Sequence, residues 1–116
     1  MGTDSCIFCK IVKKEIPAKT VFENNDILAF EDIRPQAPVH LLVISKHHIA
    51  KISDLSDEDT DLVARMVLVA KEMAKDRKIA DSGYRIVINC NQDAGQDVFH
   101  LHLHLLGGRK FAWPPG

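Results

Sequence analysis

The sequence predicts an α+β fold in which one mostly antiparallel sheet of five strands is combined with one long helix and a short N-terminal helix. Short segments of β-type composition, separated by brief turns, indicate the strands. Only one segment has the length and apolar periodicity of a long helix. The connections are too short for the crossover helices that parallel strands need, which favours antiparallel pairing. With 116 residues, we expect one domain, residues 1–116.

The composition excludes several classes of protein. Fifteen Lys and Arg residues against 16 Asp and Glu residues give a net charge of −1, whereas a protein that follows nucleic-acid phosphates carries a basic excess. A hydrophobic fraction of 46% excludes a disordered chain. Three cysteines are too few for a disulfide framework, and the sequence shows no signal peptide and no membrane-spanning run. We therefore expect a cytoplasmic protein with no nucleic-acid or membrane partner.

The first elements expected are a short helix and a hairpin. The helix covers residues 7–14 and ends before Pro17. The hairpin joins strands at 20–23 and 27–31 through the polar turn at 24–26. The helix side chains expected to face inward are Phe8, Ile11 and Val12.

A rigid loop and a central strand follow. Residues 32–38 contain two prolines, which prevent regular strand pairing. Residues 39–45 are apolar on both faces, which indicates a strand in the middle of the sheet.

The long helix is expected to begin near Ser56 and to end among the basic residues before Gly83. Ser56 and Asp59 have the spacing of a capping box, and acidic residues fill the first turn. The apolar arc of this helix is wider than the stripe of about 100° that a single core requires. We expect its flank to contact a second subunit, although a helix that lies deeper in its own core would also explain the width. The arc consists of Leu62, Val63, Met66, Val67, Val69, Ala70, Met73 and Ala74.

Two further strands are expected near the C-terminus. Residues 84–90 alternate as a strand, residues 91–96 form a polar loop, and residues 98–106 form the last strand. Because strand side chains alternate with a period of two, His100, His102 and His104 are expected to share one face of it. Three imidazoles can hold a metal ion, or one can attack phosphorus while the others bind the phosphate and move protons. The spacing alone leaves both chemistries open.

Many segments of the chain resemble one known family. The run from Gly95 through His104 is similar to the signature of the histidine-triad (HIT) family of nucleotide hydrolases and transferases. Other segments resemble the Hint branch of that family, in the same order along nearly the whole chain. These segments are residues 16–18, 29–33, 35–40, 46–49, 83–85, 106–109 and 113–116.

The resemblance implies a catalytic role for four histidines. His102 matches the nucleophile, which takes the nucleotidyl group as a phosphoramidate. His104 matches the residue that binds the phosphate and passes a proton to the leaving group. His40 matches a helper that orients the site, and His100 is the first histidine of the triad.

The resemblance also implies a site for a purine nucleotide such as AMP or GMP. Asp32 matches the residue that accepts hydrogen bonds from the ribose, and Asn89 matches a phosphate or ribose contact. Residues 95–98 are expected to offer backbone N–H groups to the phosphate. Trp113 lies in a tail that reaches toward the partner's active site in this family. The apolar slot for the base corresponds to Ile7, Phe8, Ile16, Phe30 and Ile33, and the phosphate loop consists of Gly95, Gln96, Asp97 and Val98.

The sequence departs from the common pattern of the Hint branch in two features. Asp97 stands where a serine is usual, and its carboxylate would repel a phosphate. Our hypothesis is that Asp97 favours a cationic leaving amine instead. Cys6 and Cys9 resemble the cysteines of zinc-carrying relatives, which implies a structural zinc site. Its four ligands would be Cys6, Cys9, His48 and His100, a set that zinc prefers.

The family resemblance therefore implies a hydrolase of purine nucleoside phosphoramidates or acyl-nucleotides that cleaves the P–N bond and releases a nucleoside monophosphate. Its chemistry requires no cofactor, and a homodimer is expected to form one continuous sheet. Two alternatives remain at this point. One is a nucleotide-binding sensor or scaffold with little turnover, and the other is a metal-dependent hydrolase that uses three histidines as ligands.

Overall fold

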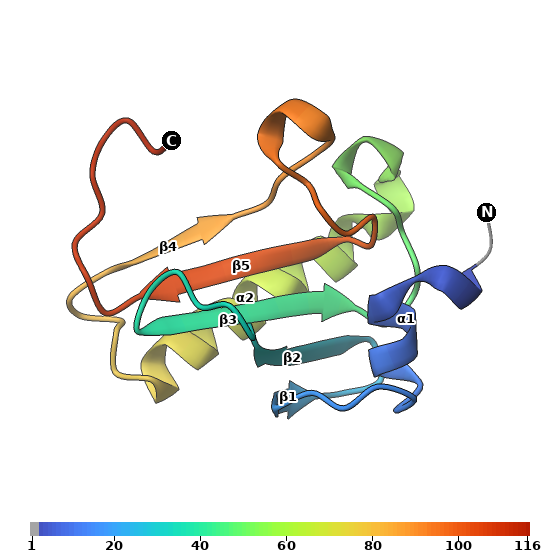
Figure 1. Ribbon diagram of the computed structural model, residues 1–116, viewed down its shortest axis with the longest axis horizontal. Coiled ribbons are helices and arrows are strands. Elements are labelled where there is room, and N and C mark those ends of the chain that lie inside the picture. The colour runs from blue at the N-terminus through green and yellow to red at the C-terminus, as the bar shows by residue number, and fades with distance from the viewer. Residues whose placement is uncertain (1–2) are drawn as a thin grey trace.

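The computed structural model describes residues 3–116 as one five-stranded antiparallel sheet with a helix on each face, which confirms the predicted fold class (Figure 1). The spatial order of the strands is β1-β2-β3-β5-β4, so β3 and β5 lie in the middle and β1 and β4 form the edges. The elements are α1 (Ile7–Val12), β1 (Thr20–Glu23), β2 (Ile27–Glu31), β3 (Val39–Ser45), α2 (Thr60–Asp76), β4 (Tyr84–Val87) and β5 (His102–Gly107). Short 3-10 turns occupy Thr3–Ser5, Ile52–Asp54, Asp57–Asp59 and Gln92–Ala94.

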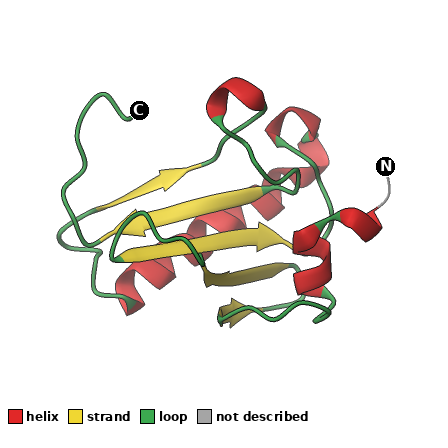
Figure 2. Cartoon of the chain, in the orientation of Figure 1, coloured by secondary structure: helices red, strands yellow, loops and turns green. Residues whose placement is uncertain are grey.

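The pairing of β3 with β5 separates the two faces of the sheet. Leu41 lies opposite Leu105, and these side chains belong to the large core under α2. The next pair, Leu42 and His104, points to the other face, where α1 covers part of the sheet (Figure 2). The central strands carry apolar side chains on both faces, because a helix covers each face of the sheet. His102 and His104 lie on the part of the α1 face that this helix leaves open. The core under α1 consists of Phe8, Ile11, Leu28, Phe30, Leu42 and Ile44.

The long helix begins one turn later than its capping residues. The Asp59 carboxylate accepts a hydrogen bond from the Ser56 backbone N–H at 2.9 Å, as the predicted capping box requires. A 3-10 turn at Asp57–Asp59 precedes α2, so the α-helix itself starts at Thr60. The predicted wide apolar arc is only partly buried within one chain: Val67 is 40% exposed, and its neighbour Leu68 is 54% exposed. The expected contact of this flank with a second subunit stays a prediction.

Three predicted elements are longer than the observed ones. The helix predicted at 7–14 ends at Val12, because Lys14 adopts a left-handed backbone conformation with φ of 66°. The strand predicted at 84–90 ends at Val87. The strand predicted from Val98 begins only at His102, and it continues to Gly107. Residues 98–101 leave the regular ladder, where the Leu101 N–H donates to the carbonyl of Ile49 at 2.6 Å.

The glycine that ends β5 is explained by a close approach of two segments. A Cβ on Gly107 would lie 2.5 Å from Cδ1 of Ile79, which follows α2 and is buried. A side chain at this position would therefore collide with the core. No helix within residues 3–116 has the length and apolar character needed to cross a bilayer.

The fold predicts a large cost for truncating the centre of β5. Leu103 is fully buried in the core under α2, so Leu103→Ala is expected to lower the free energy of unfolding by about 2–5 kcal/mol. Lys71→Ala, at an exposed position of α2, is the control and should change it by less than about 0.5 kcal/mol. Denaturant unfolding monitored by circular dichroism measures both values, and equal effects would contradict the assigned core.

Candidate active site

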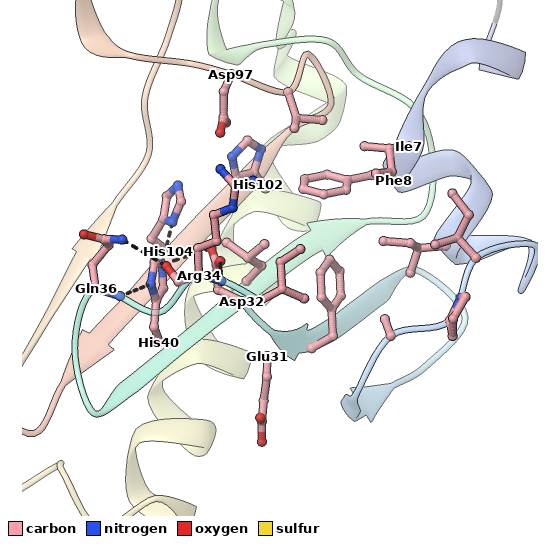
Figure 3. Close-up of a pocket in the computed structure, with 18 residues that line it drawn as sticks. Ile7, Phe8, Glu31, Asp32, Arg34, Gln36, His40, Asp97, His102 and His104 are labelled. Atoms are coloured by element: carbon pink, nitrogen blue, oxygen red, sulfur yellow. Dashed lines mark hydrogen bonds and ion pairs between the residues drawn. The ribbon is translucent and has the colours of Figure 1, made fainter.

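A cavity of about 480 Å³ opens between α1 and the histidine-bearing part of the sheet (Figure 3). Apolar side chains from α1 and β2 form one end, and polar side chains from the loop after β2, from β3 and from β5 form the other. The lining residues are Ile7, Phe8, Ile11, Ile16, Pro17, Ala18, Phe30, Glu31, Asp32, Ile33, Arg34, Gln36, His40, Leu42, Asp97, Val98, His102 and His104.

Backbone groups fix the proton positions on His40 and His104. The Gln36 N–H donates a hydrogen bond to Nδ1 of His40 at 3.0 Å, so this nitrogen carries no proton. The proton of neutral His40 is therefore on Nε2, which lies 2.9 Å from Nδ1 of His104 and donates to it. Neutral His104 in turn carries its proton on Nε2, the nitrogen left free for a ligand.

Burial keeps these two imidazoles neutral. Burial lowers the pKa of His40, although the nearby Asp32 carboxylate opposes the shift. Burial also lowers the pKa of His104 to about 4, and the neighbouring His102 and His40 reinforce the shift. Both side chains are therefore neutral at physiological pH, and the hydrogen-bond directions given above apply there.

His102 is held with its other nitrogen free. Its Nδ1 lies 2.7 Å from the carbonyl oxygen of His100, and because a carbonyl can only accept, Nδ1 carries the proton. Nε2 of neutral His102 then has a free lone pair. The ring is 5% exposed, and the edge of Phe8 packs against it with ring centroids 5.1 Å apart. The result is a nucleophilic nitrogen beside the proton-bearing Nε2 of His104.

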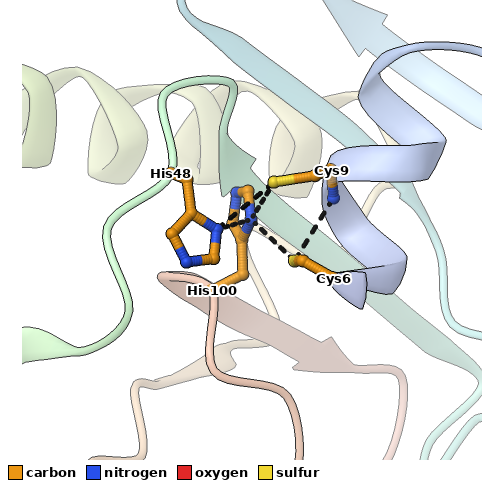
Figure 4. Close-up of side chains that lie close together, drawn as sticks. All are labelled: Cys6, Cys9, His48 and His100. Atoms are coloured by element: carbon orange, nitrogen blue, oxygen red, sulfur yellow. Dashed lines mark hydrogen bonds between the residues drawn. The ribbon is translucent and has the colours of Figure 1, made fainter. Parts of the chain in front are cut away.

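His100 points to the same face of the sheet as His102 and His104, as predicted, but it does not line the cavity with them. Leu101 belongs to the core under α2 together with Leu103 and Leu105, while the His100 ring packs against Phe8 of α1. The sheet ladder begins at His102, and His100 lies before it, fully buried. Its Nε2 donates to the carbonyl of Ser45 at 2.6 Å, which leaves a lone pair on Nδ1. That lone pair faces the two cysteines and His48 instead of the cavity (Figure 4).

Cys6, Cys9, His48 and His100 form a compact group, which we call the Cys2His2 cluster (Figure 4). Nδ1 of His100 lies 3.3 Å from Sγ of Cys6 and 3.2 Å from Nδ1 of His48, and Sγ of Cys9 lies 3.2 Å from Nδ1 of His48. Zinc bonds of about 2.3 Å to sulfur and about 2.0–2.1 Å to nitrogen place tetrahedral ligand atoms about 3.3–3.8 Å apart. The four side chains therefore fit zinc, and the Nε2 hydrogen bond of His100 supplies the outer partner that such ligands need.

A second group could hold a metal near the cavity. Asp32, His40 and His104 place ligand atoms within 4.8 Å of one another. However, Nδ1 of His104 already accepts the proton of His40, and Asp32 already accepts from the Arg34 N–H at 2.8 Å. Within residues 3–116, no such group contains His102. The geometry therefore does not favour a metal bound by the three triad histidines.

Most predicted nucleotide contacts line the cavity, and four do not. Gln96 is buried, where it accepts from the Asn91 N–H of its own loop and donates to the carbonyl of Ala50 in the segment after β3. Trp113 is 82% exposed in the C-terminal tail. The predicted contacts outside the cavity are Asn89, Gly95, Gln96 and Trp113, and His100 lies outside it as well.

The sequence reasoning missed the part of the cavity formed by the loop after β2. Arg34 and Gln36 line the cavity, and the backbone N–H of Gln36 sets the tautomer of His40. Any residue except proline can donate such a bond from its backbone, so residue type does not predict it. The only signal in the sequence was the short separation between Gln36 and His40. Glu31 also lines the cavity, although its carboxylate points away from the histidines in Figure 3.

The lowered pKa of His104 predicts how stability depends on pH. Its pKa rises from about 4 in the folded protein to the ordinary value of 6.5 on unfolding, so the unfolded chain binds more protons in this window. The free energy of unfolding should therefore fall as the pH is lowered from 6.5 to about 4. Denaturant titrations across this range should give a shallower decline for His104→Asn, whereas the exposed control His47→Asn should keep the wild-type slope. An unchanged slope in His104→Asn would contradict the assignment.

Comparisons with known proteins agree with this architecture. The family described as scavenger mRNA decapping enzyme C-term binding matches residues 5–111. An uncharacterized HIT-like protein of Synechocystis is 50% identical over 113 residues, which cover 97% of this chain and 98% of that protein. A related protein of Synechococcus elongatus is 47% identical over 98% of this chain and 99% of its own.

Solved structures of similar fold are also described as HIT proteins. A HIT family hydrolase from Legionella pneumophila superposes with a TM-score of 0.95 at 55% identity, over 97% of this chain and 100% of that chain. A histidine triad protein from Clostridium difficile has a TM-score of 0.92 at 41% identity, over 97% of each chain. With the relatives above and the arrangement of His40, His102 and His104, these matches show that the chain belongs to the histidine-triad (HIT) family.

Proposed function

We propose that this protein hydrolyses purine nucleoside phosphoramidates or acyl-nucleotides and releases a nucleoside monophosphate through a nucleotidyl intermediate on His102. The observation that carries the proposal is the hydrogen bond from Nδ1 of His102 to the carbonyl of His100, which leaves Nε2 free in the cavity. A solved relative from Candida albicans, 36% identical with a TM-score of 0.80 over 97% of this chain and 85% of that one, is described as a nucleotide-binding protein.

In the first step, the lone pair on Nε2 of His102 attacks phosphorus and forms an N–P bond. The bond between phosphorus and the leaving nitrogen breaks, and Nε2 of His104 gives that nitrogen its proton, so the amine departs neutral. The His104–His40 pair then shares the one proton of its hydrogen bond and carries a negative charge, which is balanced by the positive charge that the His102 ring acquires in the same step.

In the second step, water attacks the phosphorus of the intermediate. The N–P bond breaks, its electron pair returns to Nε2 of His102, and the proton of the water passes back to the His104–His40 pair. The adduct is labile because His102 keeps its proton on Nδ1, which makes the ring a cationic leaving group. Every group in the cycle belongs to the chain, so the chemistry requires no cofactor.

The apolar end of the cavity suits a purine base. Ile33 is 93% exposed and Ile7 is 46% exposed, and both line the cavity together with Phe30. Covering such exposed apolar surface with a flat base is favourable, by about 25 cal/mol for each Å² removed from water. The Asp32 carboxylate lies between this end and His40, 3.4 Å from Nε2 of His40, where it could accept hydrogen bonds from a ribose.

The experiment that tests the proposal is turnover of an adenosine phosphoramidate. His102→Ala is expected to lower kcat by at least about 10³-fold, because it removes the nucleophile. Mass spectrometry of the quenched wild-type reaction should find the nucleotidyl group on His102. A metal-dependent hydrolase would form no such adduct, and a pure nucleotide sensor would show no turnover to lose, so either result would contradict the proposal.

The role of His104 predicts a dependence on the leaving group. His104→Asn should lower kcat by about 10²–10⁴-fold for a substrate with an alkylamine leaving group, which must be protonated to depart. The same variant should lose far less with a nitrophenyl ester, whose leaving group departs as an anion. Kinetics with the two substrates measure the difference, and equal losses would exclude His104 as the proton donor.

We also propose that the working molecule is a homodimer with one continuous sheet, located in the cytoplasm. β4 is an edge strand, so its outer edge is available to pair with β4 of a second copy. The exposed flank of α2 at Val67 is expected to take part in the same contact. Sedimentation should give the mass of a dimer. Val67→Glu should shift the protein toward the monomer without unfolding it, whereas a monomeric wild type would contradict this assembly.

A further inference from the structure

We propose that the Cys2His2 cluster and the nucleotide cavity are coupled, so that a metal bound at the cluster and a nucleotide bound in the cavity strengthen each other's binding. Cys6, Cys9 and His48 are then positioning residues that act on His102 through other groups. The inference rests on the proposed nucleotide site and adds a control of that site by metal.

The first connection runs through His100. Its ring belongs to the cluster through Nδ1, while its own backbone carbonyl accepts the proton of His102 at 2.7 Å. The ring is also tied through Nε2 to the carbonyl of Ser45, the last residue of β3. A change in the position of His100 therefore changes the acceptor that fixes the tautomer and orientation of His102.

The second connection runs through α1. Cys6 is the N-cap of this helix, Cys9 lies one turn later, and Phe8 stands between them. The Phe8 ring packs edge-on against His102, with centroids 5.1 Å apart, and against His100, with centroids 5.8 Å apart. Phe8 also lines the cavity, as does Ile11 on the same helix. The two cysteines thus lie on the helix that forms a wall of the nucleotide site.

The shortness of α1 makes its position depend on these anchors. A helix of six residues is too short to be stable by itself, so tertiary contacts hold it in place. Its core contacts reach β2 and β3, and the cluster adds links to His48, just after β3, and to His100, just before β5. Metal bonds to Cys6 and Cys9 would hold the helix far more tightly than hydrogen bonds between thiols and imidazoles.

A separate opening leads to the cluster from outside. A second cavity, of about 340 Å³, is lined by Cys9 and His48 together with Lys13, Lys46 and His47. Neither cysteine lines the nucleotide cavity. A metal ion can therefore enter or leave through this opening while a nucleotide occupies the other site.

Thermodynamic reciprocity makes the proposal quantitative. If metal raises the affinity for a nucleotide by some factor, the nucleotide must raise the affinity for metal by the same factor. AMP affinity is measured by calorimetry on zinc-loaded and metal-free protein, and zinc affinity by competition with a chromophoric chelator, with and without saturating AMP. We expect both affinities to rise by the same factor, about five- to tenfold.

Cobalt supplies a readout that does not depend on a metal-free form. Co²⁺ in a Cys2His2 site absorbs visible light with a spectrum that reports the geometry of its ligands. Addition of AMP to the cobalt-loaded protein is expected to shift this spectrum, because His100 is shared between the two sites. An isolated structural metal site would show no shift.

Two serine variants separate the metal from the helix cap. Serine at an N-cap position stabilises a helix, so Cys6→Ser keeps the cap of α1 while it removes a zinc ligand. This variant should bind zinc weakly and lose the effect of zinc on AMP affinity. Cys90→Ser is the matched control, since Cys90 lies outside the cluster and should keep the full coupling.

Three outcomes would overturn the inference. AMP affinity that is equal in the zinc-loaded and metal-free forms, together with an unshifted cobalt spectrum, would overturn the coupling and leave the proposed hydrolase intact. Failure of the cluster to bind either metal would also overturn the coupling alone. Failure of AMP to bind in any form would overturn the coupling and the proposed function together.

Discussion

The site depends on one hydrogen bond, from Nδ1 of His102 to the carbonyl of His100. Without it, neutral His102 could carry its proton on either nitrogen, and half of the possible arrangements would have no nucleophile facing the cavity. The bond exists because the chain leaves the regular ladder just before His102, which frees the His100 carbonyl from strand pairing. His102 therefore faces the cavity with Nε2 free, whereas His100, on the same face of the sheet, lies among Cys6, Cys9 and His48.

His40 and His104 belong to a chain of hydrogen bonds whose donor-to-acceptor direction is fixed. The backbone N–H of Gln36 donates to His40, and His40 donates to His104. The proton on Nε2 of His104 is therefore left for a ligand in the cavity. Burial lowers the pKa of His40 and His104, which keeps the network neutral and preserves this direction at physiological pH. Although the chain has almost no net charge, its neutral imidazoles offer both a lone pair and a proton within one small cavity.

One face of the sheet carries the large core, and the other carries the cavity. The face under α2 carries the large core, in which Leu103 and Leu105 alternate with His102 and His104 along β5. The opposite face is covered by α1 over β2 and the adjacent part of β3, and it is open over β5, where the cavity lies. Because strand side chains alternate, the residues that anchor β5 in the core also fix the spacing of His102 and His104.

The sequence by itself determined the architecture and the chemical type of the site. Alternation and turns located the strands at 20–23, 27–31 and 39–45 with their observed bounds, and the capping pattern located the start of the long helix. Residue types were sufficient there because strand and helix periodicity are local properties. The position of His102 and His104 on one face of β5 was predictable for the same reason.

Only the tertiary structure decided what depends on distant or backbone contacts. It placed His100 outside the cavity, because its ring is held between the Ser45 carbonyl and the side chains of Cys6, Cys9 and His48. It brought Gln36 to His40 through a backbone N–H that no side chain reveals. It buried Gln96 between its own loop and the segment after β3, and it left Trp113 on the surface, away from the cavity. Periodicity gives the face on which a side chain lies, but the partners that it meets on that face come from distant segments and are decided by the tertiary structure.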